Sequence, residues 1–188
     1  MRQILVVSLL ALVALVKLPS CKKITNEWNT FRIKKDKHKS LYAINYTKDT
    51  VFKWNIIFDS SAIYKTKDSL NQYDINKLIG LSDCGDNHKE NSIRFGWRWL
   101  NDSLEIHWFK HENGGFMFDK MCTIELNKSY IYELNITNWD YNLKVNNVCV
   151  WVGRNCVKNK KRYFLYPYFG GNETAPHDIS IEIKKGDH

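Results

Sequence analysis

The sequence lacks the local motifs that mark several large enzyme classes. It has no serine-hydrolase elbow, no glycine-rich phosphate loop, no dinucleotide-binding fingerprint and no zinc-protease helix motif. These absences argue against serine hydrolases, P-loop nucleotide hydrolases, dinucleotide-dependent enzymes and zinc proteases. The chain of 188 residues also contains no internal repeat and no low-complexity segment.

Long apolar runs are scarce as well. Residues 4–16 form an apolar run behind Arg2. The run is shorter than the roughly 20 residues that span a bilayer, and it fits the core of a secretory signal peptide. We therefore expect residues 1–20 to be a signal peptide and the protein to be exported.

The residues that follow this run are Leu18-Pro19-Ser20-Cys21. They resemble the lipobox of bacterial lipoproteins, which implies lipidation of Cys21 and anchoring to a membrane of the cell envelope or to the cell surface without crossing it. The alternative is an ordinary signal peptide with Cys21 as a disulfide partner.

Acidic residues are fewer than basic ones, 20 against 28, which gives a net charge of +8. The excess of basic residues is concentrated in residues 22–39. We interpret residues 21–45 as the lipidated N-terminus and a basic tether, and residues 46–188 as one folded domain. Attraction of the basic segment to anionic lipid or polysaccharide is a second interpretation. Nucleic acid is not an expected partner, because export would separate the two.

Four cysteines besides Cys21 are available for disulfides in an oxidising compartment, and four cysteines allow three connectivities. Residues 151–155 are expected to be a hairpin turn, so we predict the pairs Cys149–Cys156 and Cys84–Cys122. Residues 84–88 contain cysteine, aspartate and histidine, but no second pair of ligands with zinc spacing accompanies them. We therefore expect no metal and no cofactor.

What the sequence has in abundance is alternation of apolar and polar residues. In residues 92–99, Ile93, Phe95, Trp97 and Trp99 alternate with polar residues and glycine. A period of two is typical of a strand with one buried and one wet face. Repeated at spacings of about 8–12 residues, it predicts an all-β, antiparallel two-sheet β-sandwich. The expected strands are residues 52–58, 93–99, 104–108, 122–126, 130–136, 141–145, 148–152, 163–165 and 179–183. Residues 69–81 are expected to be a short turn or loop.

Several segments resemble the concanavalin-like jelly rolls, the fold of laminin-G-like domains and of several polysaccharide lyases. Residues 127–134 and 141–146 are similar to a tight turn and two strands of that fold, and residues 175–181 to its closing strand. The succession of residues 75–81, 92–98 and 105–108 is similar to the order found in jelly-roll lyases of uronic-acid polymers. The resemblance implies a carbohydrate-related function.

Four polar residues are expected on one side of a hairpin. Arg94 and Arg98 belong to one expected strand, and Glu105 and His107 to the next, joined by the short turn at residues 101–103. Cross-strand neighbours lie about 5 Å apart. The cluster is compatible with surface salt bridges, each worth less than about 1 kcal/mol, and with binding of an anion or a glycan.

The same cluster is also compatible with catalysis. In β-elimination from a uronate, arginine neutralises the carboxylate and a base removes the neighbouring proton. The candidate catalytic residues are Arg98, with His107 or Tyr168 as the base. The paired carboxylates typical of jelly-roll glycoside hydrolases are absent, which argues against hydrolysis.

A second candidate is the aromatic segment of residues 163–178, which ends in Gly-Gly and polar side chains. It is compatible with a sugar-stacking platform, with Tyr168, Asn172 and His177 as ligand-binding residues. The alternative is that the alternate rings fill the core and the glycines form a turn.

These observations favour an exported, lipid-anchored β-sandwich that binds carbohydrate or an acidic polysaccharide. Whether it is an enzyme stays open. A polysaccharide lyase acting by β-elimination is the alternative, and a non-catalytic structural or interaction protein of the envelope is the third hypothesis.

Overall fold

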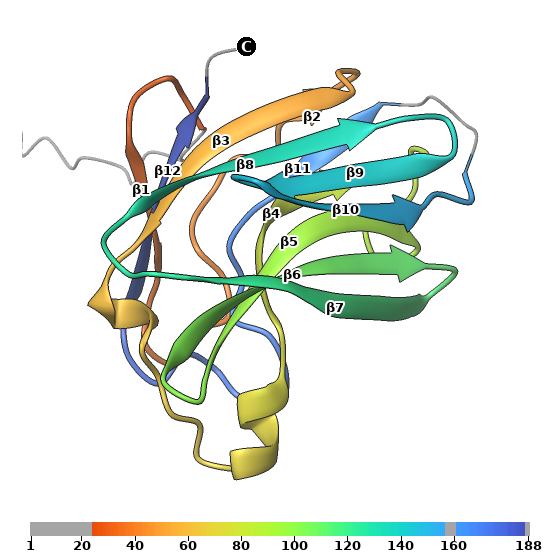
Figure 1. The fold of residues 1–188 in the computed structure, drawn as a ribbon. Helices are drawn as coiled ribbons and strands as arrows, with labels where there is room; N and C mark the ends of the chain where they lie inside the picture. The colour runs from red at the N-terminus through yellow and green to blue at the C-terminus, as the bar shows by residue number, and fades with distance from the viewer. Residues whose placement is uncertain (1–23, 157–160, 187–188) are drawn as a thin grey trace, which may run out of the picture.

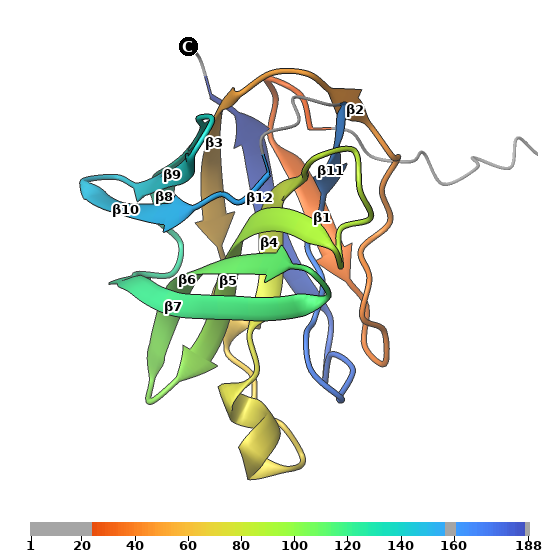
Figure 2. The ribbon, with the colours of Figure 1, turned by 90° about the vertical axis from the view of Figure 1, so that its right-hand side faces the viewer.

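The computed structural model describes residues 24–156 and 161–186, which form two antiparallel β-sheets packed face to face (Figures 1 and 2). The strands are β1 (Asn29–Ile33), β2 (Tyr46–Thr47), β3 (Val51–Phe58), β4 (Asn76–Ser82), β5 (Asn91–Leu100), β6 (Ser103–Glu112), β7 (Gly115–Ile124), β8 (Ser129–Ile136), β9 (Asp140–Val145), β10 (Val148–Gly153), β11 (Arg162–Leu165) and β12 (Ile179–Lys185). Two short 3₁₀ helices, η1 (Ser60–Ala62) and η2 (Ser69–Tyr73), join β3 to β4.

The first sheet has the strand order β1-β12-β3-β8-β9-β10, and the second has the order β2-β11-β4-β5-β6-β7. Every recorded strand pairing is antiparallel. The predicted all-β, two-sheet sandwich is confirmed. Among residues 24–156 and 161–186, no helical segment has the length and hydropathy that a membrane span requires.

The core lies between the sheets and is built by the alternating apolar residues. The side chain of Trp97 in β5 is fully buried, together with Phe95 beside it and Phe58 and Tyr132 from the first sheet. Burying such a side chain contributes about 1.5–3 kcal/mol, so rings from both layers hold the sheets together.

Turn chemistry fixes the register of β5 and β6. Asn101 and Asp102 both have positive φ, 50° and 54°, as the two central residues of a type I′ hairpin turn require. The turn pairs Leu100 with Ser103, and the ladder then places Arg98 opposite Glu105. The predicted hairpin is confirmed.

The segment that we expected to be a tether contains β1. This strand pairs with β12, and its Phe31 and Ile33 are fully buried. Residues 29–33 are thus built into the sandwich. The expected signal peptide, residues 1–20, and the predicted lipidation site Cys21 lie outside the described residues.

The disulfide connectivity differs from our prediction. Cys84 is bonded to Cys156, while Cys122 and Cys149 are free thiols. The predicted pairs Cys149–Cys156 and Cys84–Cys122 are wrong because Val148–Gly153 is one extended strand, β10, and no hairpin brings residue 156 back to residue 149. At about 3.3 Å per residue, such a strand carries the two cysteines far apart.

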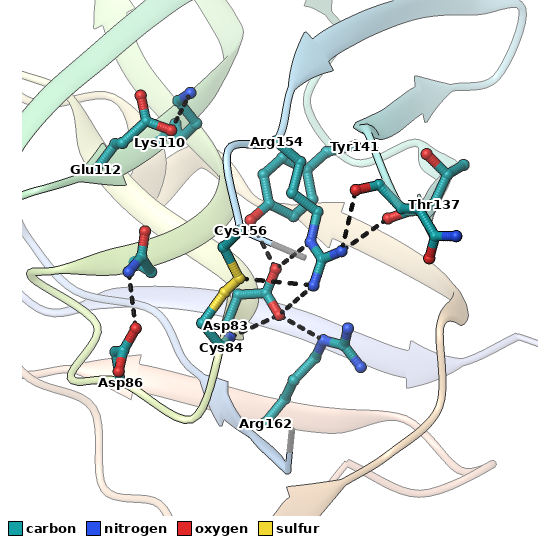
Figure 3. The surroundings of a disulfide bond; sticks show 12 residues. Asp83, Cys84, Asp86, Lys110, Glu112, Thr137, Tyr141, Arg154, Cys156 and Arg162 are labelled. Atoms are coloured by element: carbon teal, nitrogen blue, oxygen red, sulfur yellow. Dashed lines mark hydrogen bonds and ion pairs between the residues drawn. A yellow bond between two sulfur atoms is a disulfide. The ribbon is translucent and has the colours of Figure 1, made fainter. Parts of the chain in front are cut away.

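A buried ion cluster surrounds this disulfide (Figure 3). The carboxylate of Asp83, at the end of β4, accepts hydrogen bonds from Arg154 Nε at 2.6 Å, Arg162 Nε at 2.9 Å and the Tyr141 hydroxyl at 2.7 Å. Burial raises the pKa of Asp83, but the hydrogen bonds from Arg154 and Tyr141 outweigh it, and the pKa lies below its usual value. Because Tyr141 belongs to the first sheet and Arg162 to the second, the cluster ties the two layers together.

Candidate functional site

The outer face of the second sheet carries the polar residues that the alternating sequence pattern predicted on one side of the hairpin. We call it the polar face and define it by Lys77, Arg94, Arg98, Glu105 and His107. Cross-strand partners share a side of a sheet. Gly96 pairs with His107 and with Lys77, and Arg98 pairs with Glu105. The four residues expected on one side of the hairpin therefore lie together.

Half of the polar face is a compensated ion cluster. Glu105 accepts hydrogen bonds from Arg98 Nε at 2.6 Å, Lys120 Nζ at 2.7 Å and His107 Nε2 at 3.2 Å. Burial raises the pKa of Glu105, but Lys120 and Arg98 outweigh it and lower the pKa to about 2. Arg98 is thus engaged with a carboxylate within the protein, and its Nη1 also donates to the carbonyl of Tyr73.

Lys120 was not recognised from the sequence. It reaches Glu105 because a register shift between Ile106 and His107 brings Lys120 opposite His107. Such an irregularity in a ladder has no clear sequence signal.

His107 uses only one of its two ring nitrogens in a hydrogen bond. Its side chain is 2% exposed, and its Nδ1 is buried with no hydrogen-bond partner in the described structure. A carboxylate only accepts hydrogen bonds, so contact with Glu105 places the ring proton on Nε2. Burial and the charge of Arg98 lower the pKa of His107. The imidazole is therefore neutral at pH 7, with a lone pair on Nδ1.

Arg94 forms the centre of the other half of the polar face and is only 6% exposed. Its Nη2 donates to the carbonyl of Tyr166 at 2.7 Å, and its Nε is buried without a partner. Within residues 24–156 and 161–186, no carboxylate lies within ion-pair distance of this guanidinium. Burial lowers its pKa to about 10. An uncompensated buried cation is unfavourable for folding.

Lys77 adds a second cation beside Arg94. Its Nζ donates to the carbonyl of Ile75 at 2.7 Å and lies 4.3 Å from the ring centroid of Phe109. Burial, and then the charge of Arg94, lower the pKa of Lys77 to about 8. Burial and the same two cations lower the pKa of His111 to about 4. This half of the face therefore carries positive charge that the described carboxylates do not neutralise by ion pairing.

The three other predicted ligand-binding residues are dispersed. The backbone of Tyr168 pairs with Lys77, which puts it at the polar face, and its partly exposed ring stacks on His38 at 5.2 Å. His177 hydrogen-bonds to the carbonyl of Ser61 at 2.9 Å and lines a cavity of about 580 Å³ together with Trp99. Asn172 is exposed in the loop before β12.

Two rings of the aromatic segment are buried, whereas Tyr163, Phe164 and Tyr168 are partly exposed. Tyr166 and Phe169 are 3% and 2% exposed and belong to the core. Gly171 has a φ of 74°, and a side chain there would collide with Asp74. Tyr166 and Phe169 thus fill the core, and Gly171 forms a turn, as the alternative interpretation expected for these residues.

The fold of this chain is shared by solved structures of other proteins, although sequence comparisons find no match. No family model and no curated protein matches the sequence. Among solved structures, the alginate lyase AlyC3 matches with a TM-score of 0.60 at 10% identity, over 86% of this chain and 74% of that chain. The PL7 alginate lyase AlyA1 from Zobellia galactanivorans matches with a TM-score of 0.53 at 13% identity, over 84% of this chain and 75% of that chain.

A third match is SCLam, a non-specific endo-β-1,3(4)-glucanase from family GH16, with a TM-score of 0.52 at 10% identity, covering 82% of this chain and 68% of that chain. These proteins are concanavalin-like jelly rolls with two antiparallel sheets. The present chain has this fold, as its sequence resemblance implied. At such low identity the likeness concerns the fold alone.

Proposed function

We propose that the polar face binds an acidic polysaccharide. The observation that carries the proposal is Arg94, a buried guanidinium whose charge no described carboxylate compensates. Lys77 lies on the same face with a second such charge. A ligand carboxylate would accept charge-assisted hydrogen bonds from this pair, which are about twice as strong as neutral ones.

The fold comparison supports the same class of ligand. Two of the three structures compared above are alginate lyases, and AlyC3 was also solved in complex with dimannuronate, an acidic disaccharide. Fold analogy raises the expectation of a glycan ligand but does not assign residues. The residue-level support comes from the charge on the polar face.

Export and lipidation belong to this proposal. An acyl group on Cys21 together with the following basic residues would hold the sandwich at a membrane surface. There it would meet extracellular or envelope polysaccharide.

Affinity gel electrophoresis tests the binding directly. We expect alginate, polygalacturonate or hyaluronan in the gel to retard the purified protein, and added salt to weaken the retardation because the interaction is ionic. A neutral β-glucan is the matched control and should retard the protein less. Equal mobility in acidic and neutral gels would contradict the proposal and favour an envelope interaction protein without a glycan ligand.

The charge on Lys77 should make binding depend on pH. Burial and then the charge of Arg94 lower its pKa to about 8, while Asp74 raises it; His111 and the ring of Phe109 also face Lys77. We expect affinity for the acidic polysaccharide to fall as pH rises through 8, measured by titration at pH 7 and pH 9. Lys77→Arg, which keeps its charge, should flatten this dependence. An equally steep loss in that variant would exclude Lys77 as the titrating group.

Stability should move in the opposite direction. Because the pKa of Lys77 in the folded chain is below its ordinary value of 10.5, the unfolded chain binds that proton more strongly. The contribution of Lys77 to the free energy of unfolding therefore rises as pH increases from about 8 to 10.5.

A lyase is the second candidate; it would use Nδ1 of His107, which has no partner among the described residues but is buried and would have to become accessible to the substrate. In β-elimination the guanidinium of Arg94 would stabilise the uronate carboxylate while Nδ1 accepts the C5 proton. The electron pair of that C–H bond forms the C4–C5 double bond, and the bond from C4 to the glycosidic oxygen breaks. Tyr168 is the candidate donor of a proton to that oxygen.

The unsaturated product absorbs ultraviolet light, so turnover of uronate polymers can be followed directly. Absorbance that rises with the wild type and is lost in His107→Ala would establish the lyase. Retardation without absorbance would leave binding as the function.

A further inference from the structure

An exposed aromatic ladder adjoins the polar face on its β7 side. It consists of Phe109 in β6 and Phe116 and Phe118 in β7. Phe116 is 62% exposed and Phe118 is 40% exposed, whereas Phe109 is 3% exposed. β7 is the last strand of the second sheet, so these rings stand at the edge of the face.

The three rings are nearly parallel. The ring centroids of Phe109 and Phe118 are 6.0 Å apart with planes inclined by 3°, and those of Phe109 and Phe116 are 5.6 Å apart at 12°. The centroids of Phe116 and Phe118 are 6.3 Å apart at 11°. His107 and His111 pack against this ladder in edge-to-face ring pairs with Phe118 and Phe116. The rings are thus ordered by their neighbours while two of them keep large exposed areas.

The aromatic ladder lies next to the cations Arg94 and Lys77 on the same face of the sheet. Arg94 pairs with Phe109 and Phe109 pairs with Phe118, so the three residues form one row across the strands. At about 4.8 Å between strands, Arg94 and Phe118 are separated by about 10 Å along this row. Lys77 lies over Phe109, and Lys120 pairs with His107 in the adjacent row.

This arrangement fits one type of occupant. A pyranose has a C–H face that packs on aromatic rings, for the same reason that aromatic rings bury apolar surface. Arg94 and Lys77, whose charges no described carboxylate pairs with, would take acidic groups of the same ligand.

We propose that Phe116 and Phe118 form an additional sugar-stacking subsite, so that an acidic glycan crosses the strands from Arg94 to the edge of β7. This rests on the proposed function and extends it. The subsite takes the next sugar units of a chain whose charged unit is held at Arg94. It makes the protein selective for oligomers over single sugars.

The test compares oligosaccharides of increasing length with the Phe116→Ala/Phe118→Ala double variant. We expect its affinity for long acidic oligomers, measured by calorimetry, to fall about tenfold or more. Its affinity for a single uronate should stay within about twofold of wild type. Phe116→Trp/Phe118→Trp should restore binding, because tryptophan keeps the stacking surface.

Trp139→Ala is the matched control, since Trp139 is 69% exposed and lies between β8 and β9 of the first sheet. It should bind like wild type. Neither substituted phenylalanine is part of the buried core, so thermal unfolding should confirm an intact fold.

Unchanged affinity of the alanine variant for long oligomers would overturn the subsite and leave the proposed function standing. A wild type that binds no acidic glycan would overturn both. A wild type that self-associates in sedimentation, together with a monomeric alanine variant, would show that the ladder contacts a second copy and would also overturn the subsite.

Discussion

Replacing Arg94 by methionine should stabilise the fold and strongly weaken glycan binding at the same time. The guanidinium is buried, its Nε has no partner, and no described carboxylate compensates its charge. Replacement of a buried charge by an apolar side chain of similar length is often neutral or stabilising, here by about 1 kcal/mol. Loss of a buried charge that a ligand carboxylate would contact should weaken acidic polysaccharide binding about 100-fold.

Urea denaturation and affinity electrophoresis of the same preparation measure the two effects. Arg32→Met on the exposed side of β1 is the matched control, and it should change neither quantity. A variant with lower stability and normal binding would mean that Arg94 is a structural residue. Arg98→Ala should give a different result, because it removes one of the partners of Glu105 and so should lower stability as well.

The largest loss of stability is expected for Asp83→Asn. Its carboxylate lies between two buried guanidiniums and a tyrosine hydroxyl, and its side chain is fully buried. Removing the charge from such a cluster costs about 3–5 kcal/mol because buried positive charge is left without its carboxylate. Chemical denaturation with the disulfide intact measures this loss.

Asp119→Asn is the control, because Asp119 is exposed in β7 and should have almost no effect on stability. The pH dependence gives a second check. Since the pKa of Asp83 is lower in the folded chain than its ordinary 3.8, its contribution is complete above that value and is lost as pH falls below it. A wild type and an Asp83→Asn variant of equal stability at neutral pH would contradict the role of the cluster.

Strands with one buried face and one solvent-exposed face were predictable from the sequence. Alternation in β5 and β6 and the polar turn between them defined the hairpin, and the hairpin brought Arg98 and Glu105 together. Eight of the twelve strands in the described residues contain a predicted segment in full for the same reason, and β7 overlaps the predicted residues 122–126 only in part.

β4, which the sequence did not predict, and β7, which it predicted only in part, lack the alternation of buried and exposed residues. β4 was expected to be a turn or loop because its residues from Leu78 onward are buried on both faces, so no alternation marks it. β7 was recognised only near its end, because its first six residues are exposed on both faces. Phe116, Phe118 and Lys120 all belong to that part of β7. The disulfide was missed because its partners meet through packing of distant segments, which spacing does not reveal.

The bond between Cys84 and Cys156 turns the intervening chain into a covalent ring. The ring contains β5, β6 and β7 of one sheet and β8, β9 and β10 of the other. A protease that cut once at the exposed Asn113-Gly114 tip would therefore produce two fragments that stay joined. Arg94 and the aromatic ladder both lie on strands inside this ring. A single proteolytic cut would therefore not release them from the rest of the molecule.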